Sequence, residues 1–241
     1  MMGPMDTTPA GTVRDRIRAE LTEEIKAIAR RHLAEHGSAA LSLRAVAREL
    51  GMVSSAVYRY FPSRDELLTA LIVDAYDAVA DALGQADAGR RRSDLLGRWL
   101  AVAHALRSWA VAHPQEYALI YGSPVPGYRA PADTIDPATR VSLVLLRLIR
   151  DGVESGAIVA GPTAPLPKVV RADFASVRAF AAIESGDAPD SVISRGLLVW
   201  TELFGTLSFE LFGHLENVIH DFEAFFDVQM RRAGRYLLTG D

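Results

Sequence analysis

The stretch that decides the fold is Gly51–Leu68, which reads GMVSSAVYRYFPSRDELL. It combines a glycine turn, a short segment with two serines, two tyrosines and an arginine, and a proline just before a new helix start. A buried core has little use for so many polar side-chain ends, because each polar group taken out of water needs a hydrogen-bond partner. The composition therefore favours a segment whose surface contacts another molecule.

Apolar residues at helical spacing flank this stretch. Those from Val13 to Leu33 fall on one stripe, which is followed by Gly37, a residue suited to end a helix. Leu43–Leu50 predicts a short second helix, with Ser42 at its N-cap. A glycine turn separates it from a third helix, predicted over Ser54–Phe61.

The proline and the residues behind it predict where the next helix begins. Pro62 ends the third helix, and Ser63 and Glu66 have the spacing of a capping box, in which the serine oxygen accepts from the glutamate amide. Leucines and other apolar residues then continue to Val79 at helical spacing. We expect residues 63–86 to form a long helix that links the N-terminal part of the chain to the rest.

The remainder of the chain also has helical rather than strand periodicity. Loops rich in glycine and proline are predicted at 121–137 and 161–167. Further helices are predicted at about 90–113, 114–121, 137–156, 168–185, 190–213 and 218–237. We therefore expect an all-α protein with three parts: a disordered tail (1–13), a three-helix N-terminal unit (14–62) and a larger helical C-terminal part (63–241).

Composition narrows the function classes. The chain has 241 residues, 49% of them hydrophobic, and it has no cysteine, which excludes disulfides, thiolate nucleophiles and cysteine-bound zinc. The net charge of −4 argues against indiscriminate coating of nucleic acid, although residues 1–70 have a charge of +1 and residues 71–241 a charge of −5. The start shows no secretory signal, and no apolar run spans a bilayer. We expect a soluble cytoplasmic protein without a membrane partner.

Two short helices joined by a glycine turn are typical of a helix-turn-helix, whose second helix enters the DNA major groove. On the third helix, Ser54 and Ser55 are short hydrogen-bonding groups, and Ala56 is small enough to contact a thymine methyl. Val57 and Phe61 are four residues apart and are expected to face inward. Because Val53 cannot cap this helix, we expect Ser54 to take that place.

Other polar residues of the motif are candidates for the DNA backbone. The Tyr58 hydroxyl is expected to reach a phosphate, and Arg44 a phosphate or a guanine edge. Arg64, together with the amides that begin the fourth helix, is predicted to hold a phosphate, because helix N-termini attract anions. Arg59 and Tyr60 are included among the candidates, with exposure to solvent as the alternative.

These residues carry a family resemblance. The stretch SLRAVARELGMVSSAVYRYFPSRDELLTALI (42–72) closely resembles the DNA-binding domain of the TetR/AcrR family of bacterial transcriptional regulators, and the likeness covers about 14–72. The resemblance implies that residues 14–62 are a helix-turn-helix DNA-binding domain, with phosphate contacts by Ser42 and Tyr58. It also implies that residues 63–241 are a helical ligand-binding and dimerisation domain. It also implies a sequence-specific regulator that binds double-stranded DNA as a homodimer on a pseudo-palindromic operator, a repressor relieved by a small-molecule effector, with no cofactor and no enzymatic activity.

The C-terminal part resembles one subgroup of that family, known for a Trp-His-Gly signature. Trp200 and Gly205 are in place, but Phe204 stands where the histidine is usual. The resemblance implies a cavity for the effector, which the aromatic candidates suggest is hydrophobic or aromatic. These candidates are Trp99, His104, Trp109, Tyr117, Tyr121, Phe174, Arg178 and Phe204. The resemblance also implies a dimer interface on the last two helices. The candidates for this interface are Leu197, Trp200, Leu207, Leu211, Phe222 and Phe226.

Other interpretations remain open on the sequence. The helix pair also fits generic helical packing, and the last two helices also fit packing within one chain. His32 and His36 have a spacing that can bind metal, but no third ligand accompanies them, so we expect no metal site. Motifs of nucleophile turns and phosphate-binding loops are absent, so the alternative function is a helical small-molecule-binding protein without DNA activity.

Overall fold

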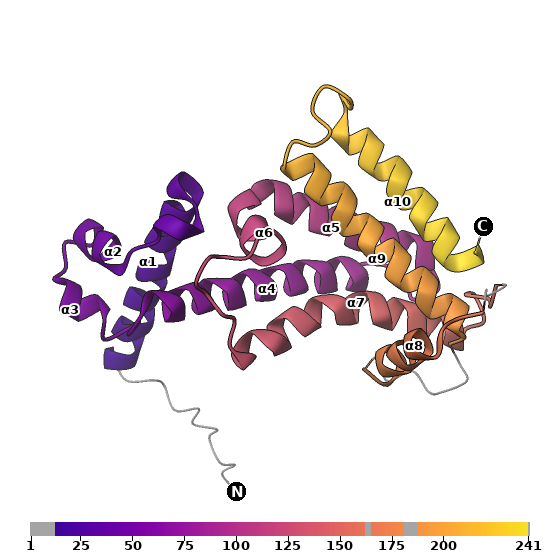
Figure 1. Cartoon of the computed structure of the whole chain (residues 1–241), viewed down its shortest axis with the longest axis horizontal. Helices are drawn as coiled ribbons and strands as arrows, with labels where there is room; N and C mark the ends of the chain where they lie inside the picture. The colour runs from indigo at the N-terminus through magenta and orange to yellow at the C-terminus, as the bar shows by residue number, and fades with distance from the viewer. Residues whose placement is uncertain (1–12, 162–164, 181–187, 241) are drawn as a thin grey trace, which may run out of the picture. The chain divides into compact units, whose positions relative to one another are not determined.

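The computed structural model describes residues 13–161, 165–180 and 188–240. Over these residues it has ten α-helices and two short 3-10 turns, and no strand (Figure 1). The all-α prediction is therefore confirmed. The tail predicted for residues 1–13 lies outside the described residues, apart from Val13, which begins the first helix.

The chain divides into two compact units, which are described separately. The first contains the chain up to Leu71 together with residues 124–129, and the second contains 72–123 and 130 onward. The helix α4 (Arg64–Ala88) begins in the first unit and continues in the second. Residues 124–129 follow the sixth helix in the chain, yet the hydroxyl of Tyr128 lies 2.9 Å from the Thr69 hydroxyl on α4.

The first unit is a three-helix arrangement completed by the start of α4. Its other helices are α1 (Val13–His36), α2 (Leu43–Glu49) and α3 (Ser54–Val57), with the 3-10 turn η1 (Ser38–Ala40) between the first two. Aliphatic side chains from all four helices are buried together in its core. They include Ile25, Leu33, Val46, Val57 and Leu67.

The turn between α2 and α3 is built on a glycine. Gly51 has φ 67°, the left-handed conformation that L side chains rarely adopt. The Met52 amide donates to the Ala47 carbonyl at 2.9 Å, the closing bond of a Schellman motif. This turn ends α2 and sets the direction in which α3 leaves it.

The third helix is shorter than predicted. Regular helix covers Ser54–Val57, and hydrogen-bonded turns continue to Phe61, whose amide donates to the Val57 carbonyl at 3.1 Å. The physical reason is Pro62, because its ring disfavours helical backbone at the residue before it. The next helix starts as predicted, since the Glu66 amide donates to Ser63 Oγ at 3.1 Å.

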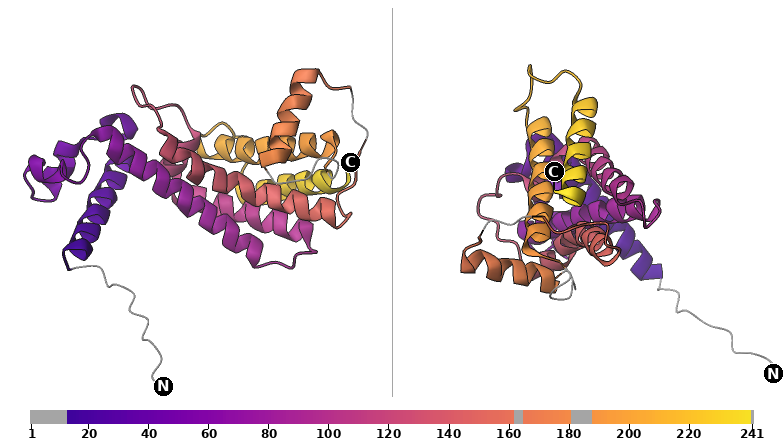
Figure 2. Two further views of the ribbon diagram at one scale, coloured as in Figure 1. Left: turned by 90° about the horizontal axis from the view of Figure 1, so that it is seen from below. Right: turned by 90° about the vertical axis from the view of Figure 1, so that its right-hand side faces the viewer.

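The second unit is a bundle of longer helices. The bounds of its elements are α5 (Leu95–Ala112), α6 (Pro114–Tyr121), η2 (Ala132–Thr134), α7 (Ile135–Glu154), α8 (Lys168–Phe180), α9 (Asp190–Leu211) and α10 (Phe222–Thr239). Helices α9 and α10 run side by side in all views (Figure 2). No helix of the described part is long and apolar enough to cross a membrane.

Several predicted helix bounds were wrong by a few residues. The helix predicted from residue 90 begins at Leu95, because Asp94 caps it by accepting from the Gly97 amide at 2.9 Å. The helix predicted from 218 begins at Phe222, where Asp221 accepts from the Ala224 amide at 2.9 Å. Asp and Asn side chains favour such caps over helix interiors. Residues 181–187, the predicted end of the eighth helix together with the link that follows it, lie outside the described residues.

Close packing and buried polar contacts fix the bundle. Trp99 is buried, and its indole donates to the Met230 carbonyl at 2.7 Å, while Gly234 leaves room for the indole ring. Arg195 is also buried, and it donates to the carbonyls of Ser191, Tyr236 and Val159. These contacts join α5 and α9 to the C-terminal helix.

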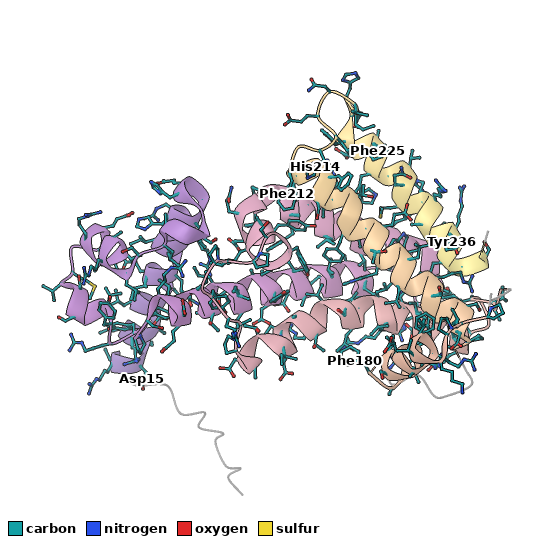
Figure 3. All side chains as sticks on the ribbon, viewed as in Figure 1. Asp15, Phe180, Phe212, His214, Phe225 and Tyr236 are labelled. Carbon is teal, nitrogen blue, oxygen red and sulfur yellow. The ribbon has the colours of Figure 1, made fainter. Side chains whose placement is uncertain are left out.

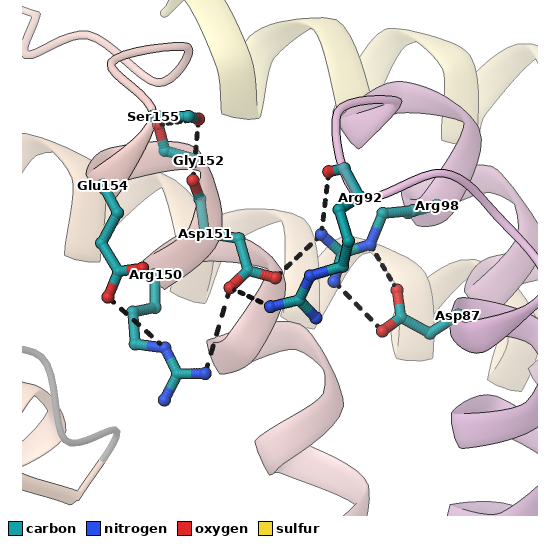
Figure 4. A network of polar contacts seen from close by, with 8 residues as sticks. All are labelled: Asp87, Arg92, Arg98, Arg150, Asp151, Gly152, Glu154 and Ser155. Atoms are coloured by element: carbon teal, nitrogen blue, oxygen red, sulfur yellow. Dashed lines mark hydrogen bonds and ion pairs between the residues drawn. The ribbon is translucent and has the colours of Figure 1, made fainter.

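An ion network joins α4, α5 and α7 (Figure 4). The Arg98 side chain has no exposed surface and lies 2.7 Å from Asp87 Oδ1 and 2.9 Å from Asp151 Oδ2. Arg92 also pairs with Asp151 at 2.8 Å. A buried charge is tolerated only when it is paired and hydrogen-bonded, and Arg98 satisfies this condition with two carboxylates.

Candidate functional site

Three polar side chains of the helix pair are exposed and make no hydrogen bond or ion pair with the described residues. Arg44 lies at the start of α2, Ser55 in α3 and Tyr58 just after it, where Tyr58 is 41% exposed. Within the part of the chain that the structure describes, none of these side chains has a hydrogen-bond or ion-pair partner. The surface therefore offers a guanidinium, an aliphatic hydroxyl and a phenol, all groups that hydrogen-bond to phosphates and base edges.

The serines at the starts of α2 and α3 occupy different positions relative to their helices. Ser42 is the N-cap residue of α2, as predicted, although its side chain makes no capping hydrogen bond. At α3 the cap position belongs to Val53, which is 72% exposed, and Ser54 is the first helical residue. The expectation that Ser54 replaces Val53 as the cap was wrong, and the Ser54 hydroxyl is half-buried and free of that role.

Ala56 is not exposed, although it was predicted to contact a thymine methyl. Its exposed fraction is 7%, and it is buried like Val57 and Phe61, the two residues expected to anchor the helix. In so short a helix the buried face takes up two of the four residues. Ala56 is therefore removed from the residues of α3 that are candidates for contact with base edges.

Arg64 is engaged within the first unit. Its Nε donates to the Leu41 carbonyl at 3.2 Å, its Nη2 to the Ser38 carbonyl at 2.8 Å, and its Nη1 lies 3.4 Å from Asp65. The guanidinium thus ties the start of α4 to the link between α1 and α2. A phosphate would have to compete with these partners, which favours a positioning role for Arg64.

Tyr60 and Arg59 are supported from α1. The Arg18 guanidinium lies 5.2 Å from the centre of the Tyr60 ring, and its Nη2 donates to the Arg59 carbonyl at 3.5 Å. Tyr60 is half-buried by this stacking, whereas the Arg59 side chain is exposed. Sequence reasoning missed Arg18, because its spacing does not distinguish it from the neighbouring exposed arginines of the same helix.

The end of α2 is held to α1 by a charged cluster. Glu49 accepts from Arg31 and lies 2.7 Å from His32 Nε2. The hydrogen bond from Arg31, followed by that from His32, lowers the pKa of the Glu49 carboxyl. His32 therefore has a carboxylate partner, and among the described residues no group of three or more potential ligands could hold a metal.

The residues predicted to line an effector cavity do not all gather in one place, although Tyr117, Tyr121 and Phe204 pack against one another. Trp99 and Tyr117 are buried in the core, and the Tyr117 hydroxyl lies 2.9 Å from Ser208 Oγ. His104 pairs with Asp227 at 3.0 Å. Others are committed to local packing or ion pairs: Trp109 stacks on His113, Tyr121 packs against Phe204, Arg178 pairs with Asp190, and Phe174 is buried.

A different set of residues lines an apolar cavity of about 210 Å³ in the second unit. It lies between α7, α8 and α9. Its walls include Ser142, Leu145, Val177, Ile193, Leu197 and Trp200. Leu197 and Trp200 were predicted at the dimer interface, and none of the predicted effector residues lines this cavity.

The predicted dimer residues separate into two groups. Leu207 and Phe226 have no exposed surface within a single chain, so their assignment to an interface was wrong. Leu197 is exposed, and Trp200, Leu211 and Phe222 are partly exposed. Further exposed apolar residues of this part of the chain are Leu198, Phe209, Phe212 and Val228. Figure 3 labels Phe212, which follows α9, and Phe225 on α10.

Two short helices with a left-handed glycine turn and uncommitted polar groups define a helix-turn-helix unit. Comparison with known proteins agrees. Residues 25–71 match the family described as bacterial regulatory proteins, tetR family, and residues 99–233 match the tetracyclin repressor-like C-terminal domain. The chain belongs to the tetR family of bacterial transcription regulators and is a DNA-binding regulator.

Similar proteins cover nearly the whole chain. The HTH-type transcriptional regulators Rv1816 of Mycobacterium tuberculosis and Mb1846 of Mycobacterium bovis are each 43% identical over 233 residues, 93% of this chain and 95% of theirs. The crystal structure of SCO4313, described as a regulatory protein, is similar with a TM-score of 0.72 and 37% identity, covering 92% of this chain and 98% of that one.

Proposed function

We propose that the protein is a homodimeric repressor that binds a pseudo-palindromic operator and is released by a small-molecule effector. The observation that carries the DNA-binding part is the set of uncommitted side chains on Arg44, Ser55 and Tyr58. In the proposed complex α3 enters the major groove, Ser55 faces base edges, and Arg44 and Tyr58 contact phosphates. The two copies of α3 occupy grooves about 34–36 Å apart.

The supporting roles follow from the contacts within the first unit. Arg64 and Arg18 hold α4 and the residues after α3 in place, and the amides at the start of α4 face a phosphate. Ser42, Ser54 and Arg59 are secondary contacts in this proposal. Regulation is proposed to take place in the cytoplasm.

The test is binding of the protein to the DNA upstream of its own gene, measured over a range of salt concentrations. We expect Arg44→Ala to weaken binding to all sequences and to reduce the salt slope by about one unit, because one phosphate contact is lost. Ser55→Ala is expected to change the preferred sequence instead. The control is Arg147→Ala, which removes the same charge from an exposed position in the second unit.

The outcomes separate the proposal from its alternative. If no such DNA is bound at low salt, the protein fits a helical small-molecule-binding protein without DNA activity. If Arg44→Ala and Ser55→Ala behave alike, the division into phosphate contact and base contact is wrong.

A further inference from the structure

The cavity between α7, α8 and α9 has the chemistry of a binding site for a small uncharged molecule. Hydrocarbon and aromatic side chains make most of its wall, and none of the described residues that line it is charged. A charged ligand would lose its hydration there without gaining a partner. An occupant with an apolar body meets no such cost.

One hydroxyl stands out in this wall. Ser142 on α7 lines the cavity, and its hydroxyl makes no hydrogen bond within the residues that the structure describes. A polar group beside an apolar cavity gains from a ligand that brings a hydrogen-bonding partner. The geometry thus supplies an apolar wall with one point of polar recognition.

The size of the cavity limits its occupant. A buried apolar cavity of about 150 Å³ is large enough to hold benzene. This cavity measures about 210 Å³ and is open to solvent on one side, where Phe180 and Leu197 are exposed. Part of the wall is fixed by close packing, because a Cβ at Gly196 would lie 2.6 Å from Ile149 Cδ1, and both residues line the cavity. The space suits one ring with a short substituent, or a short alkyl chain.

We propose that this cavity is the effector site of the regulator and that it takes a small uncharged molecule with an apolar body and one hydroxyl or carbonyl group, which bonds to Ser142. The effector role rests on the function proposed above. The occupancy of the cavity does not depend on it. A second protein chain covering Leu197 and Trp200 is the competing occupant.

The experiment uses three probes of similar size: toluene, benzyl alcohol and benzoate. Binding to the full chain is measured by ligand-observed NMR. We expect benzyl alcohol and toluene to bind and benzoate to bind at least tenfold more weakly. Equal binding of benzoate would overturn the assignment of an uncharged ligand.

Two tryptophan variants on the same helix locate the site. Val177 lines the cavity, whereas Val169 is 67% exposed and does not line it. Val177→Trp is expected to fill the cavity and abolish probe binding, while Val169→Trp leaves it unchanged. Probe binding by both variants would overturn the location. Binding of toluene and benzyl alcohol only after an interface between chains is disrupted would also overturn it, because a second chain would then be the occupant.

A milder variant covers the case in which Val177→Trp does not fold. Ser142→Ala keeps the shape of the cavity, so we expect about a fivefold loss for benzyl alcohol and no change for toluene. An equal effect on both probes would contradict the role of the hydroxyl.

DNA binding is then measured with and without benzyl alcohol. Weakened operator binding in the wild type but not in Val177→Trp supports the effector role. If the probes bind the cavity but leave operator binding unchanged, the effector role fails. If no DNA is bound at all, the proposed function fails while the NMR result still decides the occupancy of the cavity.

Discussion

At the scale of single residues, Arg98 shows how much of the bundle depends on one buried charge. It is fully buried, and the hydrogen bonds that it donates to Asp87 are the main cause that raises its pKa. Its two carboxylate partners come from the end of α4 and from α7. Removal of the guanidinium would leave both carboxylates without their central cation.

We therefore expect Arg98→Met to lower the free energy of unfolding of the second unit by about 3 kcal/mol. The value is at the lower end of the range for buried pairs, because Arg92 still pairs with Asp151. Urea unfolding followed by tryptophan fluorescence measures it, since all three tryptophans lie in this unit. Arg147→Met is the exposed control and should change stability by less than about 0.5 kcal/mol. Equal effects of the two variants would contradict the role of the network.

Prediction from sequence was uneven at this scale because residue type says little about a side chain's partners. The roles proposed for Arg44 and Tyr58 rest on exposure, which helical spacing indicates. Arg64 has the same residue type as Arg44, yet its guanidinium is directed to two backbone carbonyls that a linear pattern cannot bring together. Ala56 was predicted to contact a thymine methyl because it is small, but in a helix of four residues small size also fits burial.

At the scale of elements, Gly51 and Gly84 differ in whether the backbone requires a glycine. Gly51 takes the left-handed conformation that ends α2, whereas Gly84 lies inside α4 with no atom within 4 Å of an added Cβ. A side chain at the first position strains the backbone. A side chain at the second reduces the conformational freedom of the unfolded chain.

We expect Gly51→Ala to destabilise the first unit by about 1–2 kcal/mol, and Gly84→Ala to stabilise its helix by about 0.5–1 kcal/mol. Hydrogen exchange of the amides in α2 and α4 measures both effects locally. Faster exchange in α4 of Gly84→Ala, or unchanged exchange in α2 of Gly51→Ala, would contradict the account.

Most elements were predictable because an apolar stripe at helical spacing is sufficient to indicate a helix. The ends were harder, since Asp94 and Asp221 read as helical residues until their capping bonds are seen. Faces were hardest in α9, which is apolar on nearly all sides. Its spacing could not separate Leu207, buried in the chain, from Phe209, which is 52% exposed.

At the scale of the whole molecule, the exposed apolar surface of α9 and α10 is the proposed contact between two copies. Leu198 and Phe209 on α9, Phe212 just after it and Val228 on α10 are each more than 40% exposed. A contiguous exposed apolar surface marks an interaction site more often than scattered single residues do. A two-fold contact through this surface would use the same residues of both copies.

We expect Phe209→Asp to convert the proposed dimer to a monomer at micromolar concentration, because a charge would be buried without a partner. Analytical ultracentrifugation measures the change. Val169→Asp, which places the same charge at an exposed position on α8, is the control and should remain dimeric. A dimer that persists in Phe209→Asp would place the contact elsewhere.

The short segment 124–129 has a consequence for how this protein can be recombined. It belongs with the first unit, and its Tyr128 hydroxyl lies beside Thr69, although more than fifty residues separate them in the chain. A cut after Leu71 would therefore not release a complete DNA-binding module. A chimaera that joins this first unit to the second unit of a relative must therefore include residues 124–129 as well. Without them Thr69 loses its partner and the transferred unit is incomplete.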